Sequence, residues 1–200
     1  MAKGKTHWRK WIPPAKNSLQ MKITLRYVSP PIWRRVVVPD NITLGDLHYV
    51  MQIAMGWHNC HLHAFRVGGV EYTAPMPDED PGFGGGPPAQ HEDDVLLSQI
   101  VRRKGQQFTY EYDFGDTWLH EVRIEKITPA KEAHPRPVCL DGKRACPPED
   151  CGGVPGYVQV LHVLRSATTP DERDFREWIG AYDPERFDVA YVDHRFGSRQ

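Results

Sequence analysis

Three cysteines lie within a short stretch of the sequence, at Cys139, Cys146 and Cys151, and the last is followed by Gly152 and Gly153. Thiolate sulfur is a preferred ligand of zinc, which takes four ligands in a tetrahedral arrangement. This cysteine-rich turn, residues 139–153, is therefore a candidate zinc site that needs a fourth ligand from elsewhere. The alternative is a turn in which the cysteines pack as small apolar side chains. The candidates for the fourth ligand are Cys60, His63, His120, His134 and His162.

Two histidines, His61 and His63, fall on a predicted strand that covers residues 61–67. Because side chains alternate along a strand, both imidazoles are expected on one face. Two adjacent imidazoles can chelate a metal or pass a proton. Phe65 and Val67 share that face, so the alternative is that these are hydrogen-bonded histidines of the core.

A third group of polar residues surrounds a predicted hairpin turn at Gly115 and Asp116. Asp113 and Asp116 flank the turn, and His120 follows on the return strand. Glu149 and Asp150 add two carboxylates from the cysteine-rich turn. Together with the two histidines above, they are candidates for a metal-dependent hydrolase, in which a bound metal polarises water. The alternative is the ordinary role of aspartate in tight turns.

The positive charge of the chain is concentrated towards its N-terminus. Nine of the 25 Lys and Arg residues, and none of the 26 Asp and Glu residues, lie in residues 1–39. We expect residues 1–18 to form a flexible basic arm, since such asymmetry is typical of polyanion-binding segments. The residues predicted to contact nucleic acid through charge and stacking are Trp8, Arg9, Lys10, Trp11, Arg34 and Arg35. The alternative is that the basic end lies against the acidic body of the same chain.

Residues 74–94 are rich in proline, glycine and acidic side chains, and this composition predicts a mobile acidic loop. A loop of this kind is suited to docking a partner protein, which gives an adaptor as a third functional hypothesis. Such segments are also commonly solvated insertions with no partner.

The elements that must position these residues follow from the spacing of apolar side chains. Alternation predicts strands at 20–28, 32–38, 61–67, 70–73, 108–114 and 118–127. Helical spacing and capping residues predict helices at 44–55, 96–103, 156–166 and 170–180. Two helices have capping-box sequences, Thr43 with Asp46 and Thr169 with Glu172.

The order of these elements predicts an α+β fold, because strands and helices do not alternate regularly. We expect a single-domain roll over residues 19–195, with a mixed, mostly antiparallel sheet, one central helix and two C-terminal helices. No run approaches the roughly 18 apolar residues of a membrane helix, and the basic N-terminus is not followed by an apolar segment. A cytoplasmic protein with its four cysteines as thiols or metal ligands is therefore expected.

Several strings in the sequence resemble one known family. They include Pro31-Ile32-Trp33-Arg34-Arg35, Met55-Gly56-Trp57, His61-Leu62-His63, Tyr112-Asp113-Phe114-Gly115-Asp116 and Cys146-Pro147-Pro148-Glu149-Asp150-Cys151-Gly152-Gly153. Together they are similar to the plasmid pRiA-type ORF-three-like family, which is also described as a TnpR-like insertion-element passenger. The resemblance covers roughly residues 20–190.

The resemblance implies a compact α+β fold and an association with plasmids and mobile elements, but no reaction. No serine or tyrosine recombinase motif accompanies the passenger name. From the residues, a binding module for nucleic acid or protein with a structural cysteine-rich turn ranks first. A metal-dependent hydrolase ranks second, and a protein-interaction adaptor third.

Overall fold

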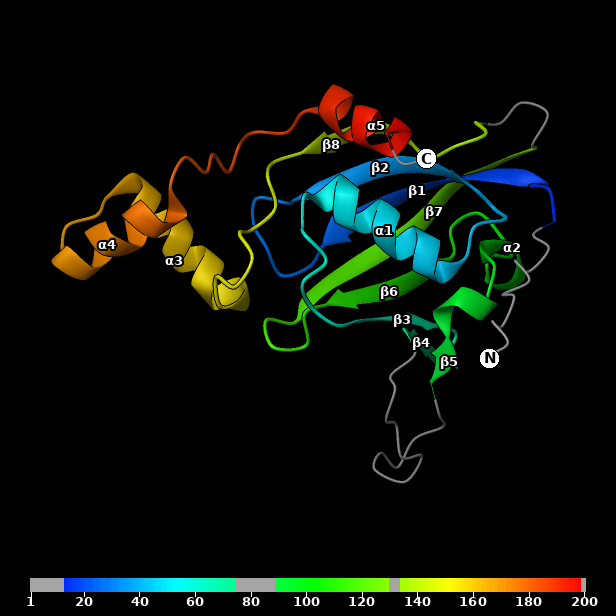
Figure 1. Ribbon diagram of the computed structural model, residues 1–200, viewed down its shortest axis with the longest axis horizontal. Coiled ribbons are helices and arrows are strands. Elements are labelled where there is room, and N and C mark those ends of the chain that lie inside the picture. The colour runs from blue at the N-terminus through cyan, green and yellow to red at the C-terminus, as the bar shows by residue number, and fades with distance from the viewer. Residues whose placement is uncertain (1–12, 75–88, 130–133, 199–200) are drawn as a thin grey trace, which may run out of the picture.

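Eight strands form one sheet in the order β5-β4-β3-β6-β7-β1-β2-β8 (Figure 1). The computed structural model describes residues 13–74, 89–129 and 134–198. All neighbouring strands are antiparallel except β4 and β5, so the predicted mixed, mostly antiparallel α+β fold is confirmed. The strands are β1 (Asn17–Leu25), β2 (Trp33–Pro39), β3 (His63–Val67), β4 (Val70–Thr73), β5 (Gln90–His91), β6 (Gln107–Tyr112), β7 (Trp118–Pro129) and β8 (Val138–Lys143).

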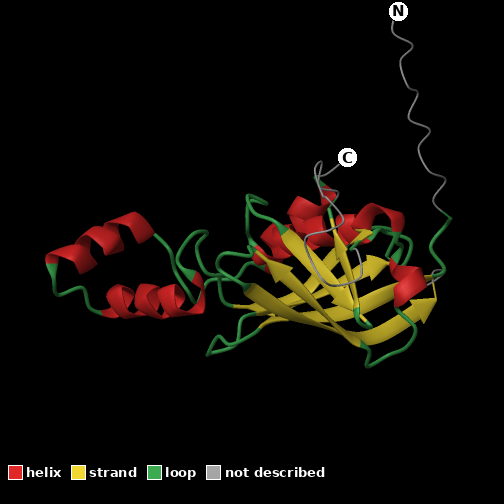
Figure 2. Cartoon of the chain, turned by 90° about the horizontal axis from the view of Figure 1, so that it is seen from below, coloured by secondary structure: helices red, strands yellow, loops and turns green. Residues whose placement is uncertain are grey.

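The core lies on one face of the sheet, beneath helix α1 (Leu44–Met55). Strand β1 alternates as its sequence predicts, with Leu19, Met21, Ile23 and Leu25 buried. Tyr27, expected on the same face, lies beyond the end of β1 and is 71% exposed. Figure 2 shows the helices of the body gathered on one side of the strands.

Helix α1 begins and ends where its sequence predicts. The Thr43 hydroxyl accepts a hydrogen bond from the amide of Asp46, and the Asp46 carboxylate accepts one from the amide of Thr43. Gly56 ends the helix in the left-handed conformation, with φ of 97°. The residues of α1 that face the sheet are apolar apart from His48 and Gln52, which are also buried.

The cysteine-rich turn contains a strand that the sequence analysis did not predict. Strand β8 pairs with β2, so Cys139 belongs to the sheet and only residues 144–152 form the connection to helix α3 (Gly153–Arg165). The prediction missed β8 because it has only six residues and stands at the sheet edge, where pairing with β2 defines it.

Three helices, not two, follow β8 in the chain. Helices α3 and α4 (Pro170–Ile179) form a hairpin that projects beyond one end of the sheet (Figures 1 and 2). Helix α5 (Val189–Gly197), which was not predicted, returns to the body and packs near β8 and α1. It extends the domain two residues past the predicted boundary at 195.

The C-terminal part of the predicted acidic loop has defined structure. Residues 75–88 lie outside the described residues, but Gln90–His91 form β5 and Glu92–Asp94 form the short 3-10 helix η1. Glu92 is 5% exposed. Residues 90–94 therefore do not belong to a mobile loop, contrary to the prediction. Helix α2 (Leu97–Ile100) follows and is shorter than the predicted 96–103.

The last residues of the predicted basic arm also have defined structure. Asn17 and Ser18 belong to β1, and the amide of Lys16 donates a hydrogen bond to the Asp40 carboxylate. Trp8, Arg9, Lys10 and Trp11 lie outside the described residues. No helix in the described part of the chain has both the length and the apolar character required to span a membrane.

Candidate metal centre

His61 lies just before β3, at the end of the sheet next to the cysteine-rich turn. It therefore does not share a strand face with His63, contrary to the prediction. Its Nε2 atom lies 3.1 Å from Asp150 Oδ1, 3.6 Å from Asp113 Oδ2 and 3.9 Å from Glu149 Oε2. Three carboxylates thus surround one imidazole nitrogen, and they come from two segments distant from His61 in the sequence.

Asp113 is held in place by the turn between β6 and β7. Its Oδ1 atom accepts hydrogen bonds from the amides of Gly115 and Asp116, at 2.9 and 3.3 Å. These bonds leave Oδ2 directed towards His61. Asp113 has φ of 58°, in the left-handed region that is unfavourable for most non-glycine residues. Aspartate tolerates this region better than most residues do, so the turn can fix the carboxylate in this conformation.

Glu149 is held by one oxygen and leaves the other unpaired. Its Oε1 atom accepts hydrogen bonds from the His58 amide at 2.8 Å and from the Tyr112 hydroxyl at 3.1 Å. Its Oε2 atom is buried and has no hydrogen-bond partner. His61 Nε2 is also buried without a hydrogen-bond partner, despite its short distance to Asp150. Buried polar atoms are normally paired, so these two atoms require an explanation.

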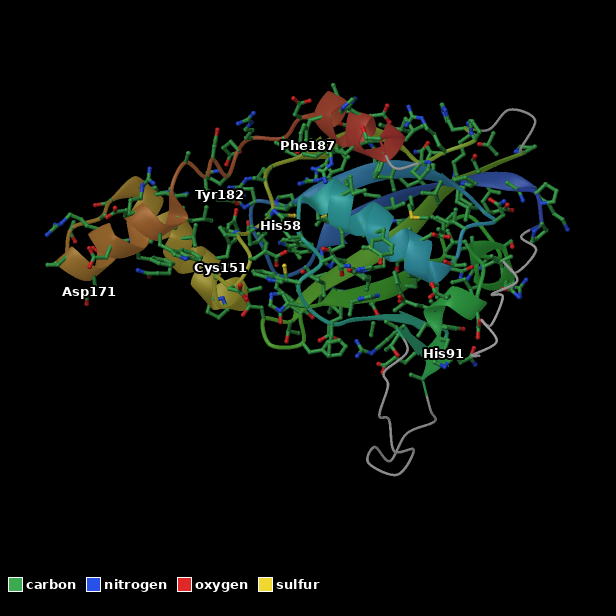
Figure 3. The ribbon with its side chains drawn as sticks, viewed as in Figure 1. His58, His91, Cys151, Asp171, Tyr182 and Phe187 are labelled. Carbon is green, nitrogen blue, oxygen red and sulfur yellow. The ribbon has the colours of Figure 1, made fainter. Side chains whose placement is uncertain are left out.

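The ligand atoms of His61, Asp113 and Asp150 all lie within 4.8 Å of one another. Within the described residues, this is the one group of three or more histidine, cysteine or acidic side chains close enough to hold a metal ion. We call His61, Asp113, Glu149 and Asp150 the junction cluster. Figure 3 marks its surroundings, with Cys151 at the base of the helical hairpin and His58 on the body.

The other predicted histidines lie elsewhere. His63 pairs with the buried Glu92 at 2.8 Å, and its ring stacks on that of His48 with centroids 3.5 Å apart. His120 is completely buried against Trp57, and burial lowers its pKa to about 4. Neither belongs to the junction cluster, so the predicted hydrolase set does not assemble as a whole.

Asp116 supports the cluster from outside it. Its carboxylate accepts a hydrogen bond from the amide of Gly152 at 3.1 Å, which joins the hairpin turn to the cysteine-rich turn. Asp116 thus links the two turns and is not a member of the junction cluster.

The three cysteines of the predicted zinc site do not come together. Their sulfur atoms form no group of potential metal ligands, even though all three residues are described. Burial raises the pKa of Cys139 and Cys146 to about 11 and that of Cys151 to about 12, so all three are thiols at neutral pH. The geometry thus matches the alternative of small buried side chains.

Arg34, predicted to contact phosphate, is 1% exposed and points into the protein. It donates hydrogen bonds to the carbonyls of Ala54, Trp33 and Lys143, and the ring of Phe187 covers its guanidinium at 4.0 Å. The bond to Ala54 places its charge at the negative end of α1. Arg34 therefore stabilises the fold and is not available to nucleic acid.

Arg35 lies on the opposite face of β2 and is partly exposed. It forms two hydrogen bonds with Glu125, at 2.7 and 3.1 Å. These bonds raise the pKa of Arg35 above the ordinary arginine value. A phosphate would have to compete with this carboxylate for the guanidinium.

Sequence reasoning missed Tyr112 and His58 as part of this site. Tyr112 is buried, and its hydroxyl accepts a hydrogen bond from the Cys60 amide while donating one to Glu149. The sequence places it only within the strand predicted at 108–114. The signal that could have identified it is its hydroxyl, since a buried tyrosine hydroxyl usually has a partner.

The fold and this site define an α+β protein with a carboxylate–histidine cluster where a helical hairpin joins an open sheet. The chain belongs to the family described as plasmid pRiA4b ORF-3-like protein, which matches residues 17–191. It is 39% identical over 165 residues to uncharacterized protein y4hQ of Sinorhizobium fredii, covering 82% of each chain. The crystal structure of MM3350, a protein of unknown function from Methanosarcina mazei Go1, is similar with a TM-score of 0.76. That similarity has 38% identity and covers 89% of this chain and 97% of MM3350.

Proposed function

We propose that this protein is a binding module that takes up one divalent cation at the junction cluster. The observation that carries the proposal is the meeting of His61 Nε2, Asp113 Oδ2 and Asp150 Oδ1. His61 Nε2 and the nearby Glu149 Oε2 are both buried and lack hydrogen-bond partners. A cation would serve as the missing partner of both His61 Nε2 and Glu149 Oε2.

The charge around the cluster supports this proposal. Three carboxylates surround His61, and no lysine or arginine within the described residues forms an ion pair with any of them. Carboxylates gathered in a partly buried site repel one another. A divalent cation removes this repulsion, whereas a single protonated imidazole removes only part of it.

The donor atoms favour a particular class of cation. One imidazole nitrogen with carboxylate oxygens suits zinc, manganese or ferrous iron, whereas calcium takes oxygen ligands only. Three carboxylates exceed the charge of a divalent cation, so the bound ion would be a weak Lewis acid. The site therefore favours a cation that holds segments together over one that activates water.

The proposal is tested with protein purified without a histidine tag. Calorimetric titration with zinc, manganese, magnesium and calcium chlorides should give one site per chain for zinc or manganese, with weaker binding of the other two. Asp113→Asn should weaken that binding at least about tenfold, because a charged ligand is lost. The control is Asp171→Asn, at the exposed far end of the hairpin (Figure 3). No binding, or equal binding by both variants, would exclude the proposal.

The same protein separates the other hypotheses. Cation-dependent turnover of p-nitrophenyl phosphate or acetate, abolished by Asp113→Asn, would favour the hydrolase. Salt-sensitive binding of labelled DNA or RNA, lost on removal of residues 1–12, would favour the nucleic-acid module. With Arg34 buried and Arg35 paired, that hypothesis now rests on the residues before Pro13.

A further inference from the structure

We infer that occupancy of the junction cluster controls how firmly the α3–α4 hairpin is attached to the sheet. This inference rests on the proposed cation binding and assigns a regulatory consequence to it. It follows from where the charges of the cluster come from in the chain.

The carboxylates of the cluster lie on two sides of one junction. Asp113 belongs to the β6–β7 turn, on the side of the sheet, as does the neighbouring Asp116. Glu149 and Asp150 belong to the segment that leads directly into α3. Negative charge therefore faces negative charge across the junction. Without a cation this arrangement pushes the two sides apart, and with one it draws them together.

Among the residues of the junction cluster, Asp150 is the one whose position depends most on the cation. Its side chain is 70% exposed, and its one ion-pair partner within the described residues is His61. It lies three residues before the first residue of α3, with φ of 56°. A displacement of Asp150 is therefore transmitted to the base of the helix.

Glu149 Oε1 crosses the junction to accept hydrogen bonds from the His58 amide and the Tyr112 hydroxyl. The remaining contacts of the junction require close approach of the backbone. The Gly152 amide donates to Asp116, and the Trp57 indole donates to the Pro147 carbonyl at 3.0 Å. A Cβ atom on Gly153 would lie 2.7 Å from the Asp116 carbonyl oxygen. These contacts weaken steeply with distance, so a small separation of the two sides releases all of them.

The hairpin then moves as a unit. Tyr157, Val160 and Val163 of α3 are buried, as is Ile179 of α4, so the two helices share an apolar interface. Their second connection to the body is the segment after α4, where the Ala145 amide donates to the Pro184 carbonyl at 3.1 Å and Arg144 forms an ion pair with Glu185 at 2.8 Å. The Tyr182 hydroxyl adds two long contacts, to the Tyr157 hydroxyl at 3.3 Å and to the Ala145 carbonyl at 3.4 Å (Figure 3). This second connection keeps the hairpin attached to the body when the junction opens.

Hydrogen exchange of the full-length protein tests the inference. Zinc or manganese chloride at ten times its measured dissociation constant should slow exchange of the amides in residues 151–165 about tenfold, if opening of the junction releases the ion. Exchange in β1, an interior strand of the sheet, should not change. Asp171→Asn should behave as the wild type.

Asp150→Asn provides the sharper test. Asparagine is well tolerated in the left-handed conformation of this residue, so the substitution removes charge without straining the backbone. In the cation-free protein it should slow exchange of residues 151–165 relative to wild type, since repulsion is reduced. Adding the cation to this variant should then have little further effect on exchange of residues 151–165.

The outcomes distinguish this inference from the proposed function. If calorimetry shows binding but exchange of residues 151–165 is unchanged, the cation does not control the hairpin and only the proposed function survives. If Asp150→Asn speeds exchange in the cation-free protein, the repulsion argument is wrong. If no cation binds, the proposed function fails and this inference fails with it.

Discussion

His61 and His63 are separated by one residue, and their environments have little in common. His63 begins β3 and points into the body, where the Glu92 carboxylate accepts a hydrogen bond from its Nε2 atom. His61 lies before the strand begins and faces the junction. Alternating side chains share a face only within a strand. Because β3 begins at His63 and not at residue 61 as predicted, the His61 imidazole was placed on the wrong face. Asp113, Glu149 and Asp150 were identified from the sequence as candidates, but their meeting with His61 depends on the tertiary fold.

His120 makes the stability of the protein sensitive to acid. Burial lowers its pKa from 6.5 to about 4, so above pH 6.5 the ring is neutral in both the folded and unfolded states. Below that pH the unfolded chain binds a proton that the folded protein excludes. We expect this group to lower the free energy of unfolding by about 2 to 3 kcal/mol between about pH 7 and pH 4.5. Urea unfolding at both pH values measures the loss.

The control for this prediction is His120→Asn. The asparagine side chain does not titrate, and it would place an amide near the position of the imidazole Nδ1 atom, which contacts the Tyr110 carbonyl at 3.3 Å. The variant should lose less stability than the wild type over the same range. Equal losses in the two proteins would show that other groups cause the acid sensitivity.

Arg34 and Arg35 offer a matched pair of substitutions. Arg34→Lys should lower the free energy of unfolding by about 2 to 4 kcal/mol, because lysine cannot reach three carbonyls at once and leaves buried acceptors unpaired. Arg35→Lys should cost less than about 1 kcal/mol, since its partner Glu125 is partly exposed. Guanidinium unfolding of both variants compares them. Similar costs would contradict the assignment of Arg34 as a structural residue.

At the scale of elements, the helices predicted best were those whose N-terminal capping residues can be recognised in the sequence. Helices α1 and α4 have the capping boxes that their sequences indicate, and in α4 Pro170 occupies the first turn. Helix α5 was missed although Asp188 caps it, because it is short and buries only two residues, Val192 and Phe196. Strand β8 and strand β5 are short and exist through pairing with distant segments, which one sequence does not reveal.

The first turn of α3 depends on Gly156. A Cβ atom there would overlap the carbonyl oxygen of Cys151, so Gly156→Ala must displace the turn or the helix. We expect the variant to lower the free energy of unfolding by at least about 2 kcal/mol. Gly197→Ala in α5 is the control, because its nearest neighbour is 4.0 Å away. Thermal unfolding should show a clear loss for the first and little change for the second, and equal effects would contradict the close packing at Cys151.

At the scale of the whole molecule, thiol reactivity reports the integrity of the fold. Cys60 is exposed, whereas Cys139, Cys146 and Cys151 are buried with raised pKa values. We expect a disulfide reagent such as Ellman's reagent to modify one thiol of the native protein quickly. The other three should react only after addition of denaturant. Cys60→Ser should remove the fast phase, and more than one fast thiol in the wild type would contradict the buried placement.

The position of β1 between β7 and β2 in the sheet has a consequence for biosynthesis. Asn17 pairs with Pro129 on one side and Ser18 with Pro39 on the other, so the strand made first needs a partner made much later. A growing chain can complete the β1–β2 hairpin early, but it must wait for β7 with one strand edge unpaired. Contacts between residues so far apart in sequence slow folding and lengthen exposure to aggregation. The nascent chain therefore passes through a stage at which this edge is open to chaperones and to other nascent chains.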